Sequence, residues 1–142
     1  MAAMNQGRFP KSSPGTPQFE RAISDIERIG SMEAGWNGHG APIAALEVRN
    51  QAIGFLRRLL SNFGTSIPAP TLIAPTSDGG VTLEWRLREP SEAIEFVFLP
   101  NGSHEYSFRD LDKDRLDRVE EDVPEGELFR WAKIALVGRT TV

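Results

Sequence analysis

Hydrophobic residues in the first half of the chain recur every three or four positions, which is the period of an amphipathic α-helix. This spacing predicts two helices. The first begins at the Thr16-Pro17 pair, because threonine is a favoured N-cap residue and proline fits the first helical position. It ends at Gly30 or runs a few residues further. The second covers 43–63, and its hydrophobic face holds Leu46, Ile53, Leu56, Leu60 and Phe63.

From residue 71 onward the period changes to two, which is typical of half-buried strands. Glycine-containing turns at 77–80 and 101–102 separate the alternating segments and indicate hairpins. We expect four strands: a short one over 71–74, a second over 81–88, and two whose inner faces hold Ile94, Phe96 and Phe98, then Tyr106 and Phe108. A last helix is predicted after Pro124, with Leu128, Trp131, Ala132 and Ala135 on its hydrophobic face.

The order α-α-β-β-β-β-α contains no strand-helix-strand alternation, so the sequence predicts an α+β fold in one domain. An antiparallel β-meander would be packed against helices on one face. Val97 and Leu99 would then lie on the opposite face, where a partner or a helix could cover them. We expect residues 1–16 to form a disordered tail, 17–137 the domain, and 138–142 a frayed end.

Composition narrows the class of protein. The 142 residues are 39% hydrophobic and 25% charged, which suits one soluble globular domain. The absence of cysteine excludes disulfides, thiolate zinc sites and cysteine nucleophiles. No hydrophobic run approaches the length of a membrane span, and the first residues lack the hydrophobic block of a secretory signal. We therefore expect a cytoplasmic protein.

Negative charge is concentrated in one segment, 110–127, which holds nine acidic and three basic residues in a chain of net charge −4. Its first carboxylates, Asp110, Asp112 and Asp114, have the spacing of a calcium-binding EF-hand loop. However, Arg115 stands at the position that requires glycine, and a strand rather than a helix precedes the loop. We therefore expect no metal here, and consider instead an acidic surface that binds a basic partner.

A glycine-rich loop over 35–42 is the main candidate for chemistry. His39 lies in this loop, and histidine exchanges protons near neutral pH. A general base would also need an orienting carboxylate, which Glu33 or Asp78 could supply if the fold brings it near. The alternative is structural: Trp36 fills the core, and the glycines beside Trp36 and Asn37 turn the chain between two helices.

Other polar residues give weaker indications of catalysis or of nucleic-acid binding. Glu84 and Glu95 could face the same side of the sheet, as glycoside hydrolysis requires, but a sheet surface offers no pocket. His104, beside a turn, is expected to be an exposed loop residue. Arg49, Arg57 and Arg58 form a small basic patch on the second helix, although the acidic net charge argues against nucleic acid.

Two motifs carry a resemblance. They are Gly35-Trp36-Asn37-Gly38 with Gly40-Ala41, and Pro75-Thr76 with Asp78-Gly79-Gly80 followed by Leu83-Glu84-Trp85. Together they resemble those of small, uncharacterised bacterial proteins. The resemblance implies a single bacterial cytoplasmic domain and no particular activity.

Because no catalytic constellation emerges, the sequence favours a non-enzymatic protein-interaction module, such as a small subunit, an adaptor or an antitoxin-like neutralising partner. It would need no cofactor and would bind another protein, or a second copy of the chain, through the sheet or the acidic segment. The alternative is a small enzyme or ligand-binding domain that uses the Trp36–His39 loop. The candidate binding residues are Trp36, Asn37, His39, Val97, Leu99, Asp110, Asp112 and Asp114.

Overall fold

The computed structural model describes residues 16–32, 35–36, 38 and 40–142. These residues form helices and strands in the order α-α-β-β-β-β-β-α. The helices are α1 (Thr16–Ile29), α2 (Leu46–Phe63), the short 3-10 helix η2 (Gly64–Ser66) and α3 (Glu125–Leu136). The strands are β2 (Leu72–Pro75), β3 (Val81–Leu87), β4 (Glu92–Phe98), β5 (His104–Asp110) and β6 (Arg115–Glu120).

The strands form one antiparallel sheet in sequence order, β2-β3-β4-β5-β6. Trp85 on β3 lies opposite Ile94 on β4, and Ile94 lies opposite Phe108 on β5. Side chains of alternate residues therefore share a face across β3, β4 and β5. The predicted α+β meander is confirmed, and the structure adds a fifth strand, β6.

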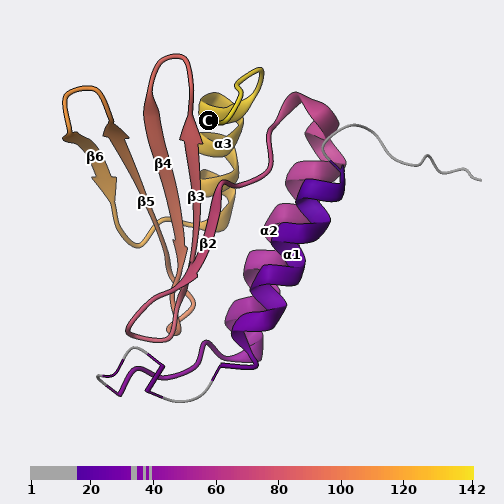
Figure 1. Cartoon of the computed structure of the whole chain (residues 1–142), viewed down its shortest axis with the longest axis vertical. Helices are drawn as coiled ribbons and strands as arrows, with labels where there is room; N and C mark the ends of the chain where they lie inside the picture. The colour runs from indigo at the N-terminus through magenta and orange to yellow at the C-terminus, as the bar shows by residue number, and fades with distance from the viewer. Residues whose placement is uncertain (1–15, 33–34, 37, 39) are drawn as a thin grey trace, which may run out of the picture.

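All three long helices lie against the same face of the sheet. Phe55 of α2 packs edge-on against Phe96 of β4, with 5.6 Å between ring centroids. Trp131 of α3 stacks on Tyr106 of β5 at 5.2 Å. Figure 1 shows α3 behind the strands and the α1–α2 pair beside the β2 edge. Within the described ranges, no helix covers the other face of the sheet.

Strand β6 was not predicted, because its residues show no hydrophobic alternation. Its outward side chains include Leu116 and Val119, which are 46% and 48% exposed. The other positions carry charges in pairs, Arg115 with Asp117 and Arg118 with Glu120. Charged side chains are common on edge strands, where they discourage pairing with other chains. The segment read as an acidic loop is therefore partly a strand.

His104 is not the exposed loop residue that the sequence suggested. It begins β5, is buried, and its Nδ1 lies 3.0 Å from the carbonyl oxygen of Val123. Its ring packs edge-on against Phe98. The prediction was wrong because Val123, nineteen residues away in the chain, supplies the partner that satisfies this ring.

The chain end is paired rather than frayed. The amide of Arg88 donates to the carbonyl of Thr140 at 2.9 Å, and the amide of Val142 donates to Arg86 at 3.0 Å. These bonds extend the sheet along the part of β3 that β2 does not reach. Local composition could not reveal this long-range pairing. Across the described residues, none of the helices is both long and apolar enough to cross a membrane.

Candidate functional site

The structure does not test the glycine-rich loop as a catalytic site. Glu33, Asn37 and His39 lie outside the described residues, so the structure does not place the predicted proton-transfer pair. Trp36 is half-buried, and its Nε1 donates to the carbonyl of Pro42 at 3.2 Å. This bond ties the tryptophan to its own loop.

The second motif has a structural role in the hairpin between β2 and β3. Thr76 Oγ1 accepts the amide of Gly80 at 2.7 Å, which closes the turn. A side chain at Gly80 would lie 2.6 Å from the carbonyl oxygen of Phe98, so only glycine fits there. Gly79, with a φ of +94°, lies so close to Pro42 that an added Cβ would be 3.3 Å from its Cγ. The two motifs therefore meet in space and pack the turn against the glycine-rich loop.

Trp85, the last residue of this motif, belongs to the core. It is fully buried, and its Nε1 donates to the carbonyl of Pro68 at 2.8 Å. A buried indole needs such an acceptor, since an unpaired N–H in an apolar environment is costly. The motif is thus explained by folding rather than by chemistry.

The acidic segment is largely neutralised by nearby arginines. Asp110 accepts the amides of Asp112 and Lys113 at 3.0 and 3.1 Å, which shapes the β5–β6 turn. Asp114 lies in the same turn, 3.7 Å from Arg109. Among the described residues, no group of three or more His, Cys, Asp or Glu could hold a metal ion. The remaining pairs are Arg115–Asp117, Arg118–Glu120, Arg130–Glu127 and Arg58–Glu125.

Two members of the predicted basic patch on α2 are engaged within the molecule. Arg49 Nε donates to the carbonyl of Ala44 at 3.0 Å. Arg58 pairs with Glu125 of α3. Arg57 is exposed. The patch therefore does not present three free guanidinium groups to the phosphates of a nucleic acid.

The face of the sheet opposite the helices is the better candidate, and we call it the open face. The register places Val97 away from Phe96 and Phe98, as the sequence predicted. Leu99 follows β4 and lies near Gly80 of the β2–β3 turn. Across the open face, Glu84 lies opposite Glu95, and Glu95 lies opposite Ser107.

A shallow depression of about 240 Å³ lies on the open face over β4, β5 and β6. Its apolar lining is Val97, Leu116 and Val119, and its charged lining includes Glu95, Glu105 and Arg109. Leu116 and Val119 were not predicted from the sequence, because each stands singly among charged residues. A β-bulge opposite Phe108 and Arg109 places Leu116 and Val119 on the same face although they are three residues apart. The two-residue period that predicts a strand is therefore broken.

Two carboxyl groups that line this depression have raised pKa values. Burial raises the pKa of Glu95, and the facing Glu84 raises it further, while Arg109 lowers it. Burial also raises the pKa of Glu105, with contributions from Glu121 and Asp78. A cation placed over Glu95 would relieve this repulsion. The open face thus combines exposed aliphatic side chains with carboxylates that favour a positive partner.

Comparison of the chain with protein-family models finds no match, and comparisons with curated proteins and with solved structures find none either. The function is therefore argued from the geometry of the open face.

Proposed function

We propose that the protein is a non-enzymatic, cytoplasmic interaction module that binds another protein through the open face of its sheet. It would act as a small subunit, an adaptor or a neutralising partner. The observation that carries the proposal is the depression formed by Val97, Leu116 and Val119 around Glu95. The helices bury the other face of the same sheet, so this is the face on which a partner can pack.

The chemistry of the depression specifies the kind of partner. Leu116 and Val119 expose aliphatic surface whose burial stabilises a complex. Glu95 and Glu105 supply negative charge beside that surface. A complementary partner would present an apolar patch that carries lysine or arginine. Such charge complementarity favours one partner over others and speeds association.

Capture from cells of the natural host, read by quantitative mass spectrometry, tests the proposal. The bait variant combines Leu116→Lys and Val119→Lys, which removes the aliphatic surface and repels a basic partner. Leu46→Lys is the matched control, since Leu46 is 60% exposed but lies at the start of α2, on the helical side. We expect one stoichiometric companion with the wild-type protein and with the control, and its loss with the double variant.

Two results would contradict the proposal. The first is a clean monomer with no companion under gentle conditions. The second is a companion that the double variant retains at full stoichiometry. Sedimentation of the purified protein provides a further measurement: a dimer that the double variant abolishes would make a second copy of the chain the partner.

A further inference from the structure

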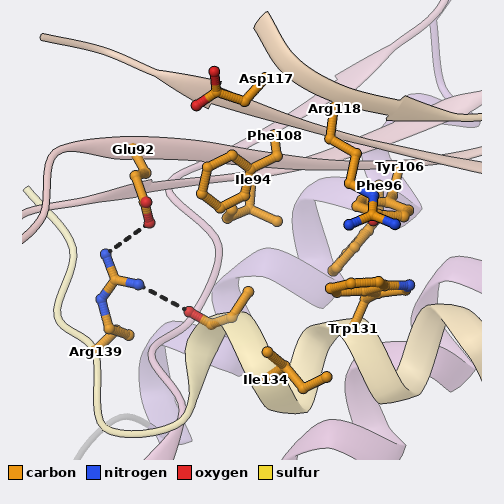
Figure 2. A pocket seen from close by; sticks show the side chains of 11 residues that line it. Glu92, Ile94, Phe96, Tyr106, Phe108, Asp117, Arg118, Trp131, Ile134 and Arg139 are labelled. Atoms are coloured by element: carbon orange, nitrogen blue, oxygen red, sulfur yellow. Dashed lines mark hydrogen bonds and ion pairs between the residues drawn. The ribbon is translucent and has the colours of Figure 1, made fainter.

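A second hollow lies on the helical side of the sheet, between α3 and strands β4, β5 and β6. It has a volume of about 400 Å³, within the range of small-molecule sites. Its walls are mainly apolar: Ile94 and Phe108 come from the sheet, and Trp131 and Ile134 from α3. Figure 2 shows these side chains converging from the two layers, with Ile134 below and Phe108 above. We call this hollow the α3 cavity.

Apolar side chains at its mouth are incompletely covered. Ile134 lines the cavity but is 61% exposed. Helix α3 packs on β5 through Trp131 and Tyr106, while the side chains of β6 are mostly exposed. The sheet therefore extends beyond α3, and the α3 cavity lies between this helix and the strands that it does not cover.

Three polar atoms around the cavity lack a hydrogen-bond partner among the described residues: Tyr106 Oη, Trp131 Nε1 and Arg139 Nε. All three belong to residues that line the cavity, and all three carry a hydrogen to donate. Burial raises the pKa of Tyr106, which keeps its phenol protonated. A buried donor without an acceptor is costly, so a ligand that supplies acceptors to these groups would be stabilised.

The two arginines of the cavity differ in availability. Arg139 is mostly buried, pairs with Glu92 at 3.0 Å and also donates to the carbonyls of Pro90 and Ala135. Its charge is matched, and it closes one end of the cavity (Figure 2). Arg118 lies at the other end, with its guanidinium 4.5 Å from the ring centroid of Trp131. Its side chain is 50% exposed, and its partner Glu120 is on the surface.

Exposed ion pairs contribute little free energy, so a ligand carboxylate can replace Glu120 as the partner of Arg118. The guanidinium lies over the Trp131 ring, and that ring stacks on Tyr106, so a carboxylate bound to Arg118 would lie beside both residues (Figure 2). An apolar ring then has room between Phe108 and Ile134. A ligand that suits this cavity therefore combines a negative charge, hydrogen-bond acceptors and an apolar ring.

We propose that the α3 cavity binds a small aromatic monocarboxylate. Its ring lies between Phe108 and Ile134, and its carboxylate pairs with Arg118 and accepts hydrogen bonds from the donors beside it. This site lies on the helical side of the sheet, away from the open face, so it does not depend on the proposed protein partner.

Nuclear magnetic resonance of the full chain tests the site with phenylacetate and its uncharged analogue phenylacetamide as probes. The indole N–H resonance of Trp131, assigned by its loss in Trp131→Phe, is expected to shift with phenylacetate. Loss of a charge-assisted hydrogen bond weakens binding by about tenfold, so phenylacetamide should bind about tenfold less tightly. Ala135→Phe fills the cavity and should abolish the shift.

Two exposed arginines over the same indole provide a matched comparison that leaves the core intact. Arg118→Gln should weaken phenylacetate binding about tenfold and leave phenylacetamide unchanged, because only the acid uses the charge. Arg130→Gln is the control, since Arg130 also approaches the Trp131 ring, at 5.6 Å, but does not line the cavity. The proposal is overturned if millimolar phenylacetate and indole-3-acetate both leave the Trp131 resonance unmoved. Equal weakening by the two arginine variants would overturn it as well.

Discussion

The two faces of one sheet differ in what their side chains do. On the helical face, Trp85 and Phe96 are fully buried and pack against aromatic rings at fixed angles. On the open face, Glu84 and Glu95 face each other across neighbouring strands. A pair of facing carboxylates does not stabilise a sheet. The helical face therefore accounts for folding, while the open face carries residues that folding alone does not require.

The largest loss of stability is expected for a substitution on the helical face. Trp85→Ala removes a fully buried ring and leaves the carbonyl of Pro68 without its donor. Truncating a buried tryptophan lowers the free energy of unfolding by roughly 3–5 kcal/mol. Urea denaturation followed by circular dichroism measures the change. Val97→Ala on the open face is the comparison, and an equal loss there would remove the distinction between the faces.

Substitution of His104 should cause the next largest loss of stability. His104→Leu keeps an apolar volume against Phe98 but leaves the Val123 carbonyl without a partner. An unsatisfied buried polar group costs about 1–3 kcal/mol. Thermal unfolding should show this loss. A variant as stable as the wild-type protein would mean that the contact does not anchor the segment leading to α3.

These two residues also show what the sequence could predict. Trp85 stands in a strict alternation of apolar and polar residues, so its burial followed from the local pattern. His104 depends on Val123, which no local pattern identifies. Strand β6 was missed for the same kind of reason: its Leu116 and Val119 are separated by charges and shifted by a bulge.

The candidate sites were less predictable than the fold. Val97 could be assigned to the open face from strand periodicity. The depression around it needed Leu116 and Val119 from a strand that the sequence did not reveal. The α3 cavity joins Arg118, Trp131 and Arg139, which come from three separate segments. Such clusters arise from topology and do not appear in residue spacing.

On the open face we expect a smaller change in stability, and this change should depend on pH. Because the pKa of Glu95 is raised in the folded protein, the native state binds more protons than the unfolded chain at pH values between the unfolded and the folded pKa. The free energy of unfolding therefore falls as pH rises from about 4.5 through the folded pKa. Glu95→Gln removes this fall. It should raise stability at pH 7 by roughly 0.2–1 kcal/mol, as relief of a like-charge cross-strand pair does.

Thermal unfolding between acidic and neutral pH measures this difference. Glu89→Gln, in an exposed turn, is the control for the loss of one negative charge. If both variants gain the same stability at neutral pH, the effect comes from net charge and not from the Glu84–Glu95 pair.

The smallest effect on stability is expected where the effect on binding is largest. Leu116→Lys with Val119→Lys alters two side chains that are already about half exposed. Lysine is well tolerated on edge strands, and surface substitutions of this kind usually change stability by no more than about 0.5 kcal/mol. Denaturation of the double variant should therefore overlay that of the wild-type protein, while the companion is lost. A large destabilisation would instead mean that β6 uses these residues for folding, and loss of the companion would then follow from unfolding.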